Sequence, residues 1–164
     1  MDLVIRDARP EEFPAIADLN VAAYRAFAPR MSAEGWSGME RSLRAVEVRA
    51  ERATFLVARL DSTLAGSVGY CPPGHSDPAV FPPEWASIVL LAVAPEHRRR
   101  GVGQGLVAAC LRRAQDDHAT TIGLFTSELM TSARRLYEQA GFVLDVELPR
   151  RHGLRYWRFT RSLA

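Results

Sequence analysis

Residues 93–105, with the sequence VAPEHRRRGVGQG, combine residue types that suit the binding of an anion. Glycine lets the backbone approach a ligand closely, and arginine supplies a fixed charge with forked donors suited to phosphate. An apolar run at 88–93 precedes the stretch, and an apolar-periodic segment at 106–114 follows it. We therefore predict a strand, a tight loop and a helix start, whose unpaired N–H groups and partial positive charge favour an anion.

The rest of the chain alternates strand and helix patterns around this stretch. Helices are predicted from Pro10 to Pro29, over 39–50 after a break at 31–39, over 106–114 and over 132–140. Residues 71–85 hold five prolines and are expected to form a loop, either next to the substrate or without a role in binding. Strands are predicted at 3–6, 54–60, 64–70, 88–93, 121–126, 143–148 and 156–162, with a basic turn at 149–155.

Composition places the chain among soluble globular proteins. It has 164 residues, of which 48% are hydrophobic and 24% charged, and no apolar run nears the ~20 residues that span a bilayer. The first residues are charged and strand-like rather than leader-like, so a cytoplasmic protein with two free cysteines is expected. All 21 basic residues are arginine, which excludes a Walker-type lysine and a Schiff-base lysine.

Charge is uneven although the net charge is only +2. Residues 61–97 hold four acids and no arginine, whereas residues 98–164 hold twelve arginines and six acids. Either this is chance, or the second half holds an anionic ligand. A nucleic-acid ligand is not expected, because no basic run is interleaved with aromatics.

The glycine loop alone is also compatible with a dinucleotide site. The G-x-G-x-x-G fingerprint of such sites fails here, because Gly101 and Gly103 fit but the last position is Leu106. The loop also follows several predicted strands rather than the first one. We therefore disfavour a Rossmann-type site.

Two motifs at the expected separation resemble those of the GNAT superfamily of acyl-CoA-dependent N-acyltransferases. The sequence RRRGVG at 98–103 matches R/Q-x-x-G-x-G/A, and ARRLYEQAGF at 133–142 is similar to A-x-x-L-Y-x-x-x-G-F. The order of predicted elements also fits, so the resemblance covers residues 1–164 as a single domain. It implies an α/β fold with a mixed, mostly antiparallel seven-stranded sheet, helices on both faces, and splayed strands at 88–93 and 121–126.

The resemblance further implies a site for acetyl-CoA as co-substrate between the splayed strands. Main-chain groups of 91–93 would pair with its pantetheine arm, as in β-augmentation, and amides of 99–104 would hold its pyrophosphate. Tyr137 matches the general acid that protonates the leaving thiolate. The expected cofactor-binding residues are Leu91, Ala92, Val93, Arg98, Arg99, Arg100, Gly101, Val102, Gly103, Gln104 and Gly105.

The sequence departs from the family pattern where other members carry polar residues. Met130 stands in place of a cofactor-contacting asparagine, and the positions of a catalytic carboxylate, Val89, Leu90 and Phe125, are apolar. No general base therefore transfers by motif. The open candidates are Glu84, His75, Asp77 and Glu128, acting directly or through water.

We predict an N-acetyltransferase that moves an acetyl group from acetyl-CoA to a primary amine by direct attack in a ternary complex. A small-molecule acceptor is favoured over a protein N-terminus or lysine, and a non-catalytic acyl-CoA-binding domain is the competing class. No metal is expected, since no His, Cys and Asp cluster has ligand spacing. The acceptor, the acyl chain length and the oligomeric state, a homodimer included, are left open.

Overall fold

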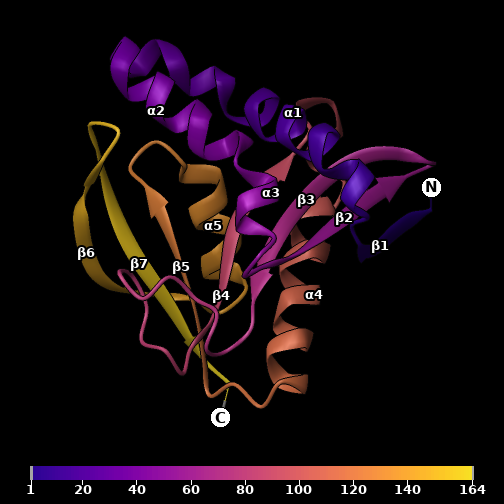
Figure 1. The fold of residues 1–164 in the computed structure, drawn as a ribbon, viewed down its shortest axis with the longest axis vertical. Helices are drawn as coiled ribbons and strands as arrows, with labels where there is room; N and C mark the ends of the chain where they lie inside the picture. Colours follow the sequence, from indigo (N-terminus) through magenta and orange to yellow (C-terminus); the bar gives the residue numbers. More distant parts are fainter. Residues whose placement is uncertain (1, 164) are drawn as a thin grey trace.

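The computed structural model describes residues 2–163, in which seven strands form one mixed sheet (Figure 1). The strand order is β1-β2-β3-β4-β5-β7-β6, and every neighbouring pair is antiparallel except the parallel pair β4 and β5. The strands are β1 (Leu3–Asp7), β2 (Thr54–Leu60), β3 (Thr63–Cys71), β4 (Ala86–Val93), β5 (Thr121–Ser127), β6 (Val143–Arg151) and β7 (Leu154–Ser162). This is the α/β fold class predicted from the sequence.

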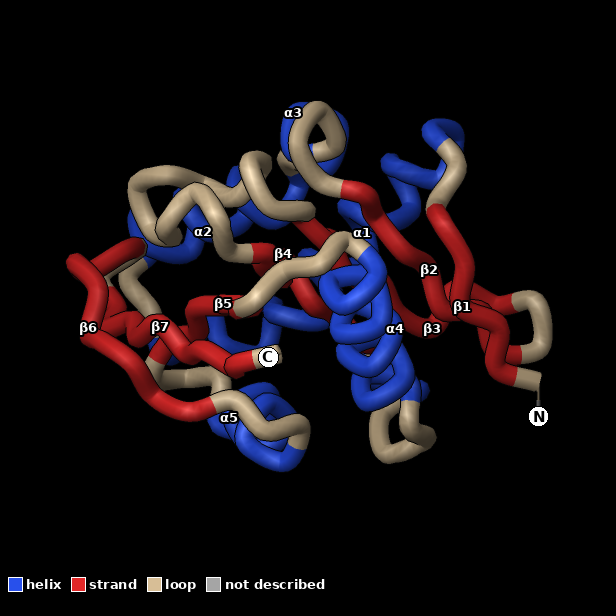
Figure 2. Tube along the Cα trace, turned by 90° about the horizontal axis from the view of Figure 1, so that it is seen from below, coloured by secondary structure: helices blue, strands red, loops and turns tan. Residues whose placement is uncertain are grey.

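Helices cover both faces of the sheet, as Figure 2 shows in a view along the sheet. On one face lie α1 (Phe13–Tyr24), α2 (Ala33–Arg44) and α3 (Val46–Arg49), and on the other lie α4 (Val102–Asp116) and α5 (Thr131–Gln139). Single turns of 3-10 helix occur at Pro10–Glu12 and Pro95–His97, and a longer one at Arg25–Arg30. Within residues 2–163, no helix is long and apolar enough to cross a membrane.

The two-residue period of β2 explains how the sheet joins these layers. Phe55 and Val57 pack with Ile16 of α1, whereas Leu56 and Ala58 belong to the cluster that includes α4. All four strand residues are buried, because successive side chains point to opposite faces and both faces are covered. Burial of both faces accounts for the nearly continuous apolar runs in the sequence.

Strands β4 and β5 separate soon after they begin. They are paired only at Ala86 with Ile122 and at Ser87 with Gly123. Further along β4, the register against β3 shifts between Ser67 and Gly69, and Leu90 has a left-handed φ of 53°. An extra residue of this kind bends a strand and increases its twist. The bulge therefore directs the second half of β4 away from β5 and creates the splay that the sequence predicted.

The predicted break at 31–39 is wrong, because α2 begins at Ala33. The Ser32 side chain caps this helix by accepting a hydrogen bond of 2.9 Å from the Gly35 amide. Two glycines early in a helix disfavour it, but a Cβ at Gly35 would lie 2.5 Å from the His152 carbonyl oxygen. The glycines thus allow α2 to pack closely on the chain between β6 and β7.

The predicted basic turn at 149–155 is shorter than expected. Strand β6 continues to Arg151 and β7 starts at Leu154, which leaves the two-residue turn His152 and Gly153. Both turn residues have positive φ, 55° and 75°, as a type I′ hairpin requires. Figure 1 shows this hairpin tip reaching toward α2.

Glu12 supports the first turn of the fold, and its removal is expected to destabilise the protein. Its carboxylate accepts two hydrogen bonds from Arg6 (2.8 and 3.0 Å) and one from the Arg9 amide (2.8 Å). The Arg6 hydrogen bonds are the main reason that the Glu12 pKa is lowered to about 2. The unfolded-state pKa is about 4.3, so this stabilisation is complete above that pH and is lost as the pH falls toward 2.

We expect Glu12→Gln to lower the free energy of unfolding by about 1–3 kcal/mol at pH 7, the range for charged hydrogen bonds. Urea denaturation of both proteins at pH 7 and near pH 3 measures this. The difference should shrink at the lower pH, and a difference that grew there would contradict the assigned role.

Candidate active site

A cavity of about 570 Å³ lies where β4 and β5 diverge. Residues from α1, the end of β4, the glycine loop and the start of α5 line it. Nine of the eleven residues expected to bind the cofactor are in its wall, whereas Arg100 and Gly105 are not. The nine are Leu91, Ala92, Val93, Arg98, Arg99, Gly101, Val102, Gly103 and Gln104.

The glycine loop presents its backbone to this cavity at the N-terminus of α4. Gly101 is the residue before the helix and has φ 78°, and a Cβ built on it would meet no atom within 4 Å. The space beside its Cα is therefore open, on a backbone conformation that side chains rarely adopt. The first amides of a 15-residue helix follow, so the loop offers N–H donors and positive partial charge to an anion.

The other two glycines of the stretch have packing roles. A Cβ at Gly103 would lie 3.0 Å from the Leu136 side chain, and one at Gly105 would lie 2.9 Å from the Ile5 side chain. Gly103 thus brings α4 close to α5, and Gly105 brings it close to β1.

The three arginines of the loop differ in their surroundings. The Arg98 guanidinium donates a hydrogen bond of 2.9 Å to the Ala23 carbonyl oxygen in the last turn of α1. It therefore ties the loop to α1, although it also lines the cavity. Arg99 is exposed, has a left-handed φ of 64° and lines the cavity, so it is the arginine best placed to meet an outer phosphate.

Leu91 forms part of the β4 wall, and its main chain is already engaged on one side. The Tyr24 hydroxyl donates a hydrogen bond of 2.8 Å to the Leu91 carbonyl oxygen. Burial raises the pKa of Tyr24, which keeps this donor protonated. Main-chain groups of 91–93 are expected to pair with the pantetheine arm. Such a ligand would share the Leu91 carbonyl oxygen with the Tyr24 hydroxyl.

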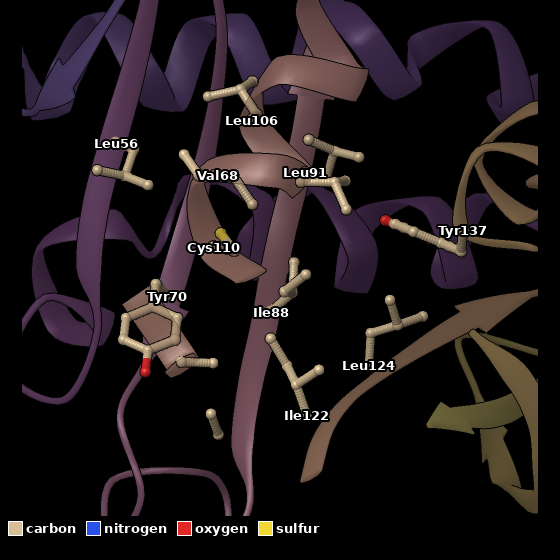
Figure 3. Close-up of a cluster of buried hydrophobic side chains, with 14 of the residues drawn as sticks. Leu56, Val68, Tyr70, Ile88, Leu91, Leu106, Cys110, Ile122, Leu124 and Tyr137 are labelled. Atoms are coloured by element: carbon tan, nitrogen blue, oxygen red, sulfur yellow. The ribbon is translucent and has the colours of Figure 1, made fainter. Parts of the chain in front are cut away.

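Tyr137 projects from α5 toward the splayed strands. Only 6% of its surface is exposed, and its ring packs edge-on against Phe142 with centroids 6.1 Å apart. Figure 3 shows its hydroxyl pointing toward Leu91 on β4. Burial is the main cause that raises the Tyr137 pKa well above its ordinary value, so the hydroxyl carries its proton at neutral pH. Tyr137 is therefore a protonated hydroxyl buried beside β4, where it can act as a proton donor.

A second cavity, of about 70 Å³, adjoins the first and shares Tyr24, Leu91 and Met130 with it. Tyr137 lines this smaller cavity and not the larger one. We call it the inner cavity. Its remaining wall comes from α2, α3, β4, β5 and the β6–β7 hairpin, namely Met39, Ser42, Leu43, Arg49, Ile88, Val89, Leu90, Phe125, Thr126, Arg151, His152 and Tyr156.

The four residues considered as general bases lie outside the walls of both cavities. The Glu128 carboxylate accepts a hydrogen bond of 2.7 Å from the Arg155 amide, and the Asp77 carboxylate accepts one of 2.9 Å from the Ala79 amide. His75 and Glu84 are exposed. None of the four can therefore take a proton directly from an amine in either cavity. Transfer to one of them would need bridging water molecules or a movement of the segment that carries it.

His152 is a cavity residue that the sequence analysis treated only as part of a basic turn. It lines the inner cavity, and burial, together with the charges of Arg151 and Arg41, lowers its pKa below the ordinary value. Its imidazole is therefore neutral at pH 7 and able to accept a proton. The His-Gly pair at a hairpin tip was the available signal, but nothing local showed that this tip packs on α2.

Among the described residues, no cysteine lines either cavity and no cluster of metal-binding residues is found. Cys71 and Cys110 are free and buried, and neither lines a cavity wall. Burial raises the pKa of Cys110 to about 12 and also raises that of Cys71, so both stay protonated. In the described part of the chain, no three His, Cys, Asp or Glu residues come close enough to hold a metal ion.

Comparison with known proteins assigns this architecture to a family. Residues 6–142 match the Acetyltransferase (GNAT) family. The chain therefore belongs to that family, as its two motifs indicated.

Individual relatives are more distant. Human N-acetyltransferase 8B is 32% identical over 88 residues, which are 54% of this chain and 37% of the human protein. The chain thus spans little more than a third of that relative.

Solved structures share the fold. The PaiA N-acetyltransferase of Thermoplasma acidophilum, solved with coenzyme A, has a TM-score of 0.79 and 17% identity over 99% of both chains. The ribosomal-protein-S18-alanine N-acetyltransferase of Escherichia coli has a TM-score of 0.69 and 16% identity over 99% of this chain and 95% of that one.

Proposed function

We propose that this protein transfers the acetyl group of acetyl-CoA to a primary amine, with Tyr137 as general acid. The observation that carries the proposal is that the two cavities adjoin and share three wall residues, Tyr24, Leu91 and Met130. One cavity leads to the anion cradle, and the other is lined by Tyr137. A donor in the larger cavity and an acceptor in the inner cavity would therefore lie on the two sides of these shared residues.

The donor fits the larger cavity by its chemistry. The pyrophosphate lies at the Gly101 turn and receives amide hydrogen bonds from the start of α4. The pantetheine arm runs along the part of β4 that β5 leaves unpaired, beyond Ser87. This places the thioester near Leu91, toward which the Tyr137 hydroxyl points.

Acetyl transfer then needs one bond to form and one to break. The neutral amine nitrogen attacks the thioester carbonyl carbon, the C–N bond forms, and the C–S bond breaks. The leaving thiolate takes the proton of the Tyr137 hydroxyl, and the amine nitrogen loses a proton, for which His152 is the acceptor in the inner cavity. The same burial that raises the Tyr137 pKa also raises that of a thiol, as at Cys110, so proton transfer to the thiolate stays feasible.

Direct attack is favoured over an acetyl-enzyme intermediate. Such an intermediate needs an activated nucleophile in the cavity, and both cysteines are protonated, buried and outside the cavity walls. A β4 main-chain amide supplies the donor for the developing oxyanion, a type of contact that often contributes the largest catalytic effect.

A small acceptor is favoured over a protein because the inner cavity holds only about 70 Å³. Two other candidates remain, a protein N-terminus or lysine as acceptor, and a non-catalytic acyl-CoA-binding role. The absence of a carboxylate on β4 and β5 in the cavity wall supports the second of these, and the position of Tyr137 argues against it.

The proposal is tested by identifying acetylated products by mass spectrometry. The protein and acetyl-CoA are incubated with a panel of small primary amines and, separately, with peptides that carry either a free N-terminus or a lysine. Acetylation of small amines is expected. Acetylation of peptides alone would assign a protein acceptor instead, and acetyl-CoA binding without any product would indicate a non-catalytic domain.

A further inference from the structure

The inner cavity carries positive charge that no acidic side chain neutralises. Arg49 and Arg151 are both in its wall, and none of its lining residues is aspartate or glutamate. Neither arginine forms an ion pair with any residue between 2 and 163. Because a guanidinium stays charged in proteins, two positive charges line this cavity with no acidic partner among residues 2–163.

Arg49 is half-buried on α3, and its hydrogen bonds are incomplete. One terminal nitrogen donates to the Ser42 hydroxyl at 2.7 Å, while the Nε atom is buried and has no hydrogen-bond partner among the described residues. Burial and the charge of Arg151 both lower the Arg49 pKa. A buried charge without a partner is costly unless something pairs with it.

Arg151 lies at the end of β6 and contributes to the wall of the inner cavity. Its guanidinium carbon lies 4.8 Å from the ring centroid of Phe125 on β5, so the side chain is held over an aromatic face. Such stacking leaves the N–H groups at the edge of the guanidinium plane available for an acceptor. His152 beside it adds no fixed charge at neutral pH, since its pKa is lowered.

The charged groups outside the cavity do not change this balance. Asp77 acts on Arg49 only through space and is exposed, with its carboxylate bonded to the Ala79 amide. Arg41 lies on the exposed side of α2, where it donates to the Ser37 hydroxyl. Paired guanidinium groups with free donors are the arrangement that proteins use to hold carboxylate and phosphate groups.

We propose that the acceptor is a primary amine that also bears an oxyanion, a carboxylate or phosphonate, and that Arg49 and Arg151 hold this oxyanion in the inner cavity. The inference rests on the proposed function and adds a substrate class to it. The anion at the two arginines and the amine near Tyr137 orient the acceptor from its two ends.

The test compares an α-amino acid, its phosphonate analogue and the amine that remains after decarboxylation, each as acceptor with saturating acetyl-CoA. We expect kcat/KM for the two amines that bear an oxyanion to exceed that of the decarboxylated amine by about 10- to 100-fold. This is the effect of one or two charged hydrogen bonds. Arg49→Met and Arg151→Met should each bring this ratio toward one by raising KM, with the KM of acetyl-CoA unchanged. Arg44→Met, on α2 but outside the cavity and ion-paired with Asp18 and Glu40, should keep the wild-type ratio.

Calorimetric binding of the amino acid to the CoA-loaded protein gives a readout that does not need turnover. Weaker binding in either arginine variant supports the anion site. If the Arg49 variant fails to fold, binding to the Arg151 variant alone decides whether the anion site exists. A wild-type ratio near one, a ratio that survives in both variants, or an equal loss in Arg44→Met would overturn the inference. If no amine is acetylated, the proposed function fails, and the calorimetry still decides whether the arginines bind an anion.

Discussion

Replacing Tyr137 by phenylalanine is expected to lower kcat by about 100- to 1,000-fold, within the range that a positioned general acid contributes. The change removes only the hydroxyl that points toward Leu91, and it keeps the ring that packs on Phe142. The leaving thiolate must then take its proton from water, which this buried site admits poorly. Binding of acetyl-CoA should be unaffected, because the larger cavity is lined by other residues.

Tyr70→Phe is the matched control for this substitution. Tyr70 is also buried, and its hydroxyl donates a hydrogen bond of 2.7 Å to Asp117, away from both cavities. It should keep nearly the full kcat. Steady-state kinetics with acetyl-CoA and the best amine measure both variants, and equal activity of Tyr137→Phe and wild type would remove Tyr137 from the mechanism.

Gly101→Val is expected to weaken CoA binding by about 10- to 100-fold, the cost of losing charge-assisted hydrogen bonds to a phosphate. The valine side chain would occupy the open space beside the loop, where the structure places no protein atom within 4 Å of a Cβ. It would also sit on a backbone with φ 78°, which costs about 1–2 kcal/mol in stability for a residue with a Cβ.

Gly74→Val separates these two effects. Gly74 has φ 87° and equally open space, but it lies in the loop between β3 and β4 and lines neither cavity. Both variants should therefore lose similar stability in thermal unfolding, and only Gly101→Val should lose CoA affinity in isothermal titration. If both variants bound CoA as the wild type does, the pyrophosphate would not lie at the Gly101 turn.

Local patterns were sufficient to predict most of the fold. The apolar run of β4 predicted a strand buried on both faces, and burial by α1 and α4 explains it. The start of α2 was missed because Gly35 looked like a helix breaker. The capping role of Ser32 is local and could have been recognised, but the packing of His152 against that glycine depends on tertiary structure.

The sequence likewise pointed to one part of the candidate site and not to the other. The donor side comes from contiguous motifs, so their resemblance to the GNAT family was enough to single out the Gly101 turn and Tyr137 as candidates. The acceptor side joins Arg49 on α3 with Arg151 and His152 at the β6–β7 hairpin, about a hundred positions later. These residues meet only because the hairpin tip packs on α2, and no sequence period or spacing encodes that contact.

Release of free CoA from acetyl-CoA, followed continuously with and without the panel of amines, tests acetyl transfer by direct attack. Slow release is expected with acetyl-CoA alone, and the rate should rise and saturate with an accepted amine. One acetylated amine is expected for each CoA released, with no acetylated protein in an intact-mass measurement. Tight CoA binding with no stimulation by any amine at any pH would contradict acetyl transfer, and a stoichiometric acetylated protein would contradict direct attack.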